Sequence, residues 1–347
     1  CRGEFEAAFA TALPGIDPRV VRAAIAATGD FADRCTARLD LAKPGKYLVA
    51  PEVPEEYDGD FDLWLLDLCR EGVIDRFGCD LGAMHGDYGS RLIHELRTIR
   101  DLGFAGYFVA VWDVRRWSRE KGILCGPGRG SAAGSLVSYV LRITDLDPVQ
   151  HGLSFERFLA PGRVDLPDID CDFESQRRGE VIDYLRDTYG DDRVANISTH
   201  NKIGGKRALR DLGRIYSIPD HLTTPLLPLI ADDDGDRKAL ATALRTTSPG
   251  QAVERAFPGL ADVAERLEGN LRDVGMHAAG VVLSSVPLRN LVPMETRPVP
   301  GSGGLRVPAV AFDWHGAEAM GLVKLDVLGL RTLTTVATAL RLAGREV

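Results

Sequence analysis

Three aspartates alternate with apolar residues near the middle of the chain, in the segment Pro-Asp-Ile-Asp-Cys-Asp-Phe at 167–173. In a β-strand, successive side chains point to opposite faces, so Asp168, Asp170 and Asp172 share one face. Aspartate is disfavoured in strands and like charges repel, so such a face needs positive charge opposite it. Divalent cations are the simplest source, and we expect this strand to hold Mg²⁺ for phosphoryl transfer. The spacing leaves open whether Asp168 and Asp170, or Asp170 and Asp172, form the metal-binding pair.

A glycine-rich turn, Gly-Pro-Gly-Arg-Gly-Ser at 126–131, comes before a mostly apolar segment at 136–141. A turn of this kind that leads into a helix can bind anions, because free backbone N–H groups and the helix dipole face outward. It is not a P-loop, since no lysine follows the last glycine. The looser dinucleotide pattern at 128–133 lacks a following strand with a ribose-binding acid. A tight turn that lets a helix pack closely explains the glycines equally well.

Two further charged patterns stand out. Lys206, Arg210 and Arg214 recur every four residues and therefore line one face of a predicted helix. A regular basic stripe suits a phosphate backbone, and a solvated helix face is the alternative. Lys324 and Asp326 share one face of an apolar strand predicted at 321–329, where a charged pair requires partners.

Composition bounds the class of protein. The chain has 347 residues, 45% of them hydrophobic, which is enough for two or three globular domains. The net charge of −8 excludes a simple nucleic-acid coat protein, but it allows an enzyme that meets DNA through a local basic patch. We expect no signal peptide and no membrane-spanning segment, and the scattered cysteines predict reduced thiols. Because the chain starts at Cys1 rather than Met, we expect it to be a piece of a longer protein.

Periodicity and turn residues predict both helices and strands. Residues 1–36 are predicted to be helical, with Asp17 and Pro18 starting a helix, and 215–270 to form a small helical insert. Further helices are predicted at 60–78, 89–101, 107–120 and 177–189. Strands are predicted at 47–50, 280–285, 310–313 and 321–329, with a short one at 123–125, whereas the Pro- and Gly-rich 293–308 is predicted to be a loop.

Taken in order, the motifs resemble the alpha subunit of bacterial DNA polymerase III, the C family of replicative polymerases. The resemblance rests on Gly-Pro-Gly-Arg-Gly-Ser at 126–131, Ile-Thr-Asp-Leu-Asp-Pro at 143–148, Phe-Glu-Arg-Phe-Leu at 155–159, the aspartate segment at 167–173, Lys206 with Arg-Asp-Leu-Gly-Arg at 210–214, His-Ala-Ala-Gly-Val-Val at 277–282, and Gly-Leu-Val-Lys-Leu-Asp-Val-Leu-Gly-Leu-Arg-Thr at 321–332. It departs from the family at 275–280, where Met276 replaces the usual lysine. It also departs at 310–311, where Val-Ala replaces the usual Thr-Gln, and at the unusual segment 200–203. We therefore expect a divergent member.

The resemblance implies an α+β (mixed α/β) fold, with a polymerase-beta-like nucleotidyltransferase palm and an inserted helical thumb. The palm would comprise 37–199 and 282–334, and the thumb 200–281. Residues 335–347 would begin the fingers, and 1–36 would be the end of, or the linker from, a missing PHP domain.

The resemblance also implies site residues. Asp168, Asp170 and Asp326 match the family's metal-binding aspartates, which selects the first pair and leaves Asp172 a supporting residue beside an arginine or lysine. Two Mg²⁺ ions would be the cofactors. The implied nucleotide-binding residues are Arg129, Gly130, Ser131, Arg157 and Lys324, and the implied DNA-binding residues are Lys206, Arg210, Arg214 and His277. For His277, a hydrogen-bonded structural role is an equal alternative.

The activity implied is template-directed DNA synthesis, in which a nucleotide is transferred from a dNTP to a primer 3′-hydroxyl and pyrophosphate is released. Primer–template DNA and dNTP would be the partners, with a sliding clamp and other replisome subunits bound through regions outside this chain. The expected location is the cytoplasm, at the nucleoid, with no membrane partner. The alternatives are a truncated remnant that binds DNA without polymerising, and another two-metal nucleotidyltransferase or phosphohydrolase, which would need no primed template.

Overall fold

The computed structural model describes residues 7–8, 11, 15–36, 41, 45–84, 86–160, 162, 167–231, 238–299 and 303–345. The chain divides into two compact units, Cys1–Leu41 and Ala42–Val347. In the first unit, helix α2 spans Pro18–Arg34, and Asp17 caps it by accepting a hydrogen bond from the Arg19 amide at 2.8 Å. The predicted helix start at Asp17 is therefore confirmed, while most of residues 1–14 lie outside the described part of the chain.

The second unit is organised around a six-stranded mixed sheet with the strand order β1-β6-β3-β2-β5-β4. The strands are β1 (Asp170–Glu174), β2 (Val194–Lys202), β3 (Leu271–Leu283), β4 (Met294–Pro298), β5 (Arg306–Val310) and β6 (Val323–Leu330). The pairs β1–β6 and β2–β5 are parallel, and the other neighbours are antiparallel. The prediction of a mixed α/β fold is confirmed at this level.

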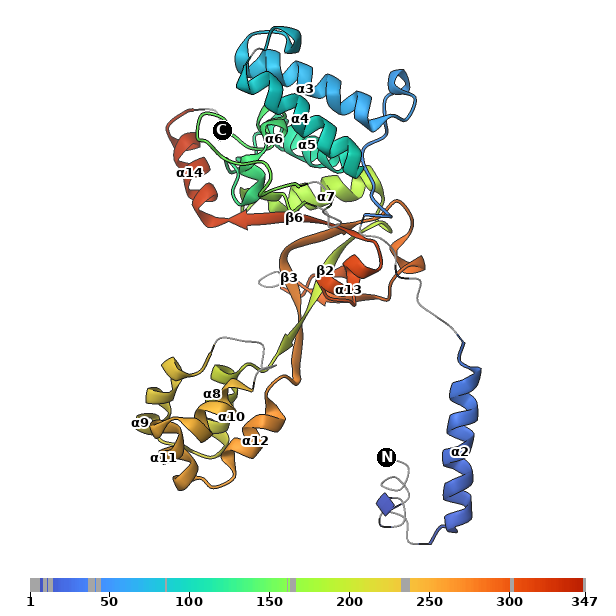
Figure 1. The fold of residues 1–347 in the computed structure, drawn as a ribbon, viewed down its shortest axis with the longest axis vertical. Coiled ribbons are helices and arrows are strands. Elements are labelled where there is room, and N and C mark those ends of the chain that lie inside the picture. Colours follow the sequence, from blue (N-terminus) through green and yellow to red (C-terminus); the bar gives the residue numbers. More distant parts are fainter. Residues whose placement is uncertain are drawn as a thin grey trace. The chain divides into compact units, whose positions relative to one another are not determined.

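Helices accompany this sheet, and α3 to α7 among them contribute to the largest hydrophobic core. They are α3 (Phe61–Phe77), α4 (Asp87–Leu102), α5 (Ala105–Glu120), α6 (Leu136–Val140), α7 (Arg178–Tyr189), α13 (Trp314–Ala319) and α14 (Arg331–Leu342). Helices α3, α4 and α5 lie side by side, and α14 continues directly from β6 (Figure 1). Helix α5 is buried along most of its length. Its Tyr107 reaches the segment that leads into β1.

A smaller helical segment with its own core lies between β2 and β3. It comprises α8 (Gly205–Ile215), α9 (Asp220–Thr223), α10 (Ala239–Thr246), α11 (Ser248–Ala256) and α12 (Leu260–Leu267). The strands β2 and β3 lead into and out of it as a paired ribbon, with His200 opposite Val274 and Lys202 opposite Leu271. The buried carboxylate of Glu268, which follows α12, accepts hydrogen bonds from the Leu240 and Ala241 amides in the first turn of α10. The predicted helical insert is therefore present.

Several local predictions are wrong. Residues 47–50 form a turn and an irregular stretch rather than a strand, although Tyr47 makes backbone hydrogen bonds to Gly321 and Ser285. The predicted strand at 123–125 reduces to a single bridge at Cys125. The predicted loop 293–308 contains β4 and most of β5, and the strand predicted at 310–313 ends at Val310.

The prolines within the two strands β4 and β5 lie where they break no ladder. Pro298 ends the edge strand β4, and Pro308 lies outside the two-residue pairing of β5 with β2. Strand β2 was not predicted, and β3 starts at Leu271 rather than at 280.

Among the described residues, no helix has the length and apolar content needed to cross a bilayer, and the five described cysteines are free thiols.

Candidate active site

Three carboxylates converge where β1 and β6 run side by side. Asp170 is the register partner of Asp326 in this parallel pair, and Asp168 lies two residues before Asp170 on the same side. Carboxylate oxygens of the three residues lie within 4.8 Å of one another. The strand pairing therefore brings together the trio predicted from sequence, even though the helical segment separates its members along the chain.

The core fixes the backbone that carries these carboxylates. The Tyr107 hydroxyl on α5, which is 1% exposed, accepts a hydrogen bond from the Ile169 amide at 3.3 Å. Ile169, between Asp168 and Asp170, is itself buried, and Leu325 and Val327 are buried on either side of Asp326. The apolar face of each strand therefore anchors the carboxylate face, as alternation requires.

Two cations neutralise part of this cluster. Arg129 Nη2 lies 2.8 Å from Asp170 Oδ1, and Lys324 Nζ lies 2.8 Å from Asp326 Oδ2. The Lys324 ammonium also lies 5.2 Å from the centroid of the Trp314 ring, a cation–π distance that helps to fix it. Arg129 and Lys324 therefore supply part of the positive charge that the carboxylate face was predicted to need.

Two of the carboxylates have raised pKa values. Burial by neighbouring atoms raises the pKa of Asp168, and Asp326 raises it further through its charge and a hydrogen bond, against the lowering effect of Lys324. Burial also raises the pKa of Asp170; Arg129 lowers it, and Asp168 and Asp326 raise it again. When all three carboxylates are ionised, their negative charge exceeds the positive charge of Arg129 and Lys324, which disfavours ionisation.

The donor set fits a hard divalent cation. Carboxylate oxygens are the preferred ligands of Mg²⁺ and Ca²⁺. Asp326 Oδ1 is buried and has no hydrogen-bond partner among the described residues, and such an orphaned oxygen is costly unless something binds it. Asp168, Asp170 and Asp326 are therefore the residues that could hold a metal.

The glycine-rich turn lies against the carboxylate cluster. Gly130 has φ +68°, and a Cβ there would come 3.0 Å from Asp170 Oδ2. Gly128 has φ +98°, and its Cβ would come 2.6 Å from Thr144 Cγ2. Both positions therefore require glycine, one of them because the turn approaches a candidate ligand so closely. Ser131 is exposed at the start of a single 3₁₀ turn, Ser131–Gly134.

The expected helix start behind this turn is already occupied. The buried carboxylate of Glu95 on α4 accepts hydrogen bonds from the Leu136 and Val137 amides, each at 3.0 Å, and from the Ser135 hydroxyl at 2.9 Å. Burial raises the pKa of Glu95. An anion therefore cannot use the N-terminus of α6. Within the described residues, no acceptor is assigned to the amides of 129–131, and these remain available.

Asp172 lies outside the three-carboxylate cluster. It is 5% exposed, and its two oxygens accept hydrogen bonds from Arg129 Nε at 3.2 and 3.0 Å. The cluster of described residues contains Asp168 and Asp170 but not Asp172. The geometry therefore favours the first of the two metal-binding pairs left open by the sequence, and Asp172 lies beside an arginine as expected.

His277 is part of a distortion in β3. Its Nδ1 accepts hydrogen bonds from the amides of Ala279 at 3.3 Å and Gly280 at 2.6 Å, and burial lowers its pKa. Gly280 pairs with Asp326, so the ring lies next to the cluster, but its acceptor nitrogen is engaged in the protein's own backbone.

Within the described part of the chain, the carboxylate cluster does not include the other predicted binding residues. Arg157 is exposed, and no ion pair joins it to the cluster. Lys206, Arg210 and Arg214 lie along α8, where Arg210 and Arg214 are exposed and Arg214 pairs with Asp211 at 3.1 Å. Their assigned roles remain predictions.

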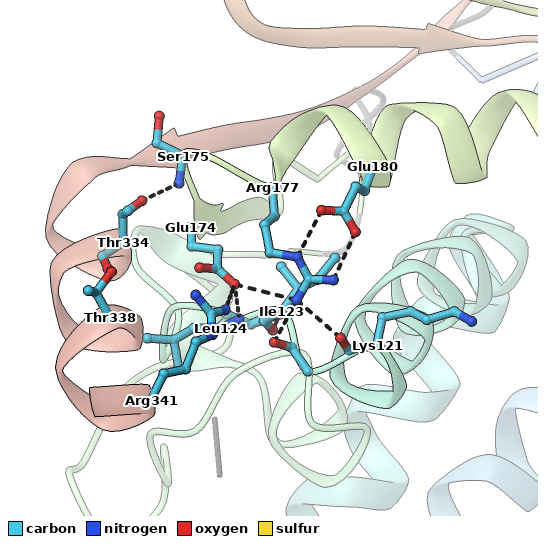
Figure 2. A network of polar contacts seen from close by, with 12 residues as sticks. Lys121, Ile123, Leu124, Glu174, Ser175, Arg177, Glu180, Thr334, Thr338 and Arg341 are labelled. Atoms are coloured by element: carbon cyan, nitrogen blue, oxygen red, sulfur yellow. Dashed lines mark hydrogen bonds and ion pairs between the residues drawn. The ribbon is translucent and has the colours of Figure 1, made fainter. Parts of the chain in front are cut away.

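One polar hub was missed by the sequence interpretation (Figure 2). Glu174, fully buried at the far end of β1 from Asp170, accepts hydrogen bonds from Arg341 Nη2 of α14 at 2.6 Å and from the Leu124 amide at 3.3 Å. Arg177 Nη1 lies 3.8 Å away and also donates to carbonyl groups at the end of α5. The signal was present, because Glu174 is the fourth acid in the same two-residue alternation.

Comparisons with known proteins show which family the chain is similar to. Residues 63–329 match a family model described as the bacterial DNA polymerase III alpha NTPase domain. The chain is 39% identical over 331 residues to the DNA polymerase III subunit alpha of Bacillus subtilis (strain 168), a match that covers 93% of the chain and 28% of that protein. It is 44% identical over 259 residues to that of Thermus aquaticus, covering 73% of the chain and 20% of the relative. The matches thus span between 20% and 28% of these two relatives' length.

Proposed function

The chain belongs to the bacterial DNA polymerase III alpha family, and on this premise we propose that it is the catalytic segment of a longer, template-directed DNA polymerase. The observation that carries the proposal is the convergence of Asp168, Asp170 and Asp326 beside the close-approaching turn at Gly130. The reaction would be attack of a primer 3′-hydroxyl on the α-phosphate of a dNTP, with release of pyrophosphate. Primer–template DNA and dNTP would be the substrates.

The proposed division into domains follows the family. The sheet and its helices would form the palm, from 37–199 and 282–334, and the segment 200–281 would be the thumb. The separate hydrophobic core of the helical segment and the β2–β3 ribbon that leads into it support this division. Residues 335–347 would begin the fingers, and 1–36 would be the end of, or the linker from, a PHP domain.

We propose that Asp168, Asp170 and Asp326 hold two Mg²⁺ ions. When bound, such ions lower the pKa of the attacking hydroxyl and neutralise the leaving pyrophosphate. The orphaned Asp326 Oδ1 and the raised pKa values of the other two carboxyls support this assignment, because added positive charge would relieve both.

The nucleotide's triphosphate would lie along the glycine-rich turn. The backbone amides of 129–131 are free to donate to phosphate oxygens, and Gly130 leaves room beside Asp170. Arg129 and Lys324 already lie at the cluster and would add positive charge there, with Arg157 as a further candidate. Ser131 would face the same phosphates from the start of the 3₁₀ turn.

The DNA backbone would contact the basic stripe of α8, formed by Lys206, Arg210 and Arg214. The helical periodicity of these residues and the exposure of the two arginines support this role. For His277, the hydrogen bonds accepted by Nδ1 support a structural role rather than a contact with DNA. A sliding clamp and other replisome subunits would bind elsewhere on the longer protein, and the compartment would be the cytoplasm.

The deciding experiment is nucleotide incorporation by the full-length protein with and without a primed template, in Mg²⁺ and in EDTA. Extension that requires both primer–template and Mg²⁺ supports the proposal. Release of phosphate or pyrophosphate from dNTP without DNA would instead indicate another two-metal enzyme. DNA binding without any extension would indicate a remnant. The 347-residue chain alone is expected to bind DNA weakly and to extend primers poorly.

A further inference from the structure

A single guanidinium group joins two aspartates of β1 that differ in their surroundings. Arg129 Nη2 contacts Asp170, a member of the candidate metal cluster, at 2.8 Å. Arg129 Nε contacts both oxygens of Asp172, which belongs to no cluster among the described residues. The Nε side of the guanidinium therefore binds Asp172, a carboxylate outside the candidate metal cluster.

Asp172 lies at a tightly packed junction between β1 and the glycine-rich turn. Its carbonyl accepts a hydrogen bond from the Gly126 amide at 2.9 Å, and a Cβ on Gly126 would come 2.9 Å from the Asp172 Cβ. On the other side, the Gly126 carbonyl accepts a hydrogen bond at 2.9 Å from Arg115, whose side chain is 2% exposed. The turn that carries Arg129 is thus fixed to the strand that carries Asp172.

The two contacts of Arg129 are not equivalent. The Asp172 carboxylate is buried, and a charge-assisted hydrogen bond to a buried carboxylate is strong. The contact to Asp170 competes with any cation that Asp170 binds. A guanidinium held by Nε keeps its position when its Nη partner changes, and its Nη groups then point toward the space beside Asp170.

We propose that Asp172 is a positioning residue for the incoming nucleotide. It holds Arg129 through Nε, so that the Nη groups can leave Asp170 for the triphosphate without loss of the side chain's orientation. This inference rests on the proposed polymerase function and deepens it. It also separates Asp172 from the metal ligands, with which it shares a strand face.

The test replaces Asp172 by asparagine in the full-length protein and measures two kinds of binding. Mn²⁺ affinity is measured by electron paramagnetic resonance without nucleotide. The Kd for dNTP is measured on a primer–template whose primer ends in a dideoxynucleotide, so that no turnover occurs. Asp172→Asn should leave Mn²⁺ affinity within about twofold and weaken dNTP binding about tenfold, the loss expected for one charge-assisted pair.

Two further variants show how Asp172 acts. Arg129→Ala should weaken dNTP binding by at least as much, and the double variant should be no weaker than Arg129→Ala alone, because Asp172 acts through Arg129. The matched control is Glu174→Gln, another buried carboxylate of β1 that pairs with a different arginine (Figure 2). It should lower the melting temperature and leave the Kd for dNTP within about twofold.

Several outcomes would overturn the inference. Loss of Mn²⁺ binding in Asp172→Asn would make Asp172 a ligand. Additive losses in the double variant, or an equal loss in Glu174→Gln, would mean that Asp172 acts independently of Arg129 or only through strand stability. If the unsubstituted protein binds no dNTP on a primed template, the proposed function itself fails; if it binds dNTP and Asp172→Asn binds equally well, only the positioning role fails.

Discussion

Asp170 and Asp326 lie side by side as register partners on the parallel strands β1 and β6. Carboxylate oxygens of these two residues and of Asp168 lie within 4.8 Å of one another. A parallel pairing between strands so distant in sequence places like charges together, which costs free energy unless the site binds positive charge. The arrangement therefore indicates selection for a ligand at the expense of metal-free stability.

The first prediction concerns that cost. Because the pKa of Asp168 is raised in the folded protein, the folded state binds the proton more tightly than the unfolded state does. Stability is then lost as pH rises above about 3.9, the ordinary aspartate value, and through the raised pKa. Asp168→Asn should raise the melting temperature in EDTA at pH 7 and have little effect at pH 3.5. Scanning fluorimetry across pH tests this, and a variant less stable than the parent at pH 7 would contradict it.

The second prediction concerns Gly130. Gly130→Ala combines a positive φ with a Cβ 3.0 Å from Asp170 Oδ2, so it should displace the carboxylate as well as strain the backbone by about 1 kcal/mol. The matched control is Gly59→Ala, which has φ +80° and no atom within 4 Å of its Cβ. Both should lower the melting temperature, but only Gly130→Ala should weaken Mn²⁺ binding. Equal Mn²⁺ affinities in the two variants would show that the turn does not shape the metal site.

The third prediction concerns the basic stripe of α8. Arg210→Ala and Arg214→Ala should each weaken binding to DNA of any sequence. Each should also reduce the slope of the logarithm of the DNA-binding constant against the logarithm of the salt concentration by about 1 in magnitude. The control is Arg245→Ala in α10 of the same helical segment, which pairs with Asp262 and Glu265 and should leave the slope unchanged. Fluorescence anisotropy at several salt concentrations provides the measurement. Slopes that do not change in either stripe variant would mark the stripe as a solvated surface.

The fourth prediction concerns the hub at the end of β1. Arg341→Ala leaves the buried Glu174 carboxylate with fewer partners and should lower the free energy of unfolding by about 1–2 kcal/mol, less than for a fully buried pair because Arg341 is partly exposed. Urea unfolding measures the change, with Arg345→Ala in the same C-terminal stretch as the control. If the two variants lose the same stability, the hydrogen bond to Glu174 contributes nothing measurable.

Strand alternation and helical periodicity were enough to predict much of this structure. The alternation at 167–173 predicted the carboxylate face, and the charged pair inside an apolar segment pointed to β6. What the residues alone could not provide was the pairing of Asp170 with Asp326, because register between distant strands depends on tertiary contacts that leave no local pattern. The choice of Asp326 came from the family resemblance.

The missed elements have specific physical causes. Strand β2 has polar residues at Asn196, Ser198 and His200, so its sequence gives only a weak strand signal. Its pairing with β3 and β5 stabilises it instead. The role of Glu95 was invisible for a similar reason. A glutamate on one helix that caps another can be recognised only once the two helices are packed together.

We propose that Asp170 and Asp326, together with Asp168, form one catalytic metal site. The most direct measurement is single-nucleotide incorporation on a primed template in Mg²⁺ by the full-length protein with Asp170→Asn or Asp326→Asn, alongside DNA binding by the same variants. Each substitution should lower the incorporation rate by about 100-fold or more, since each removes several kcal/mol of charge stabilisation, while DNA affinity stays within about twofold. Incorporation at the unsubstituted rate by either variant would contradict the account.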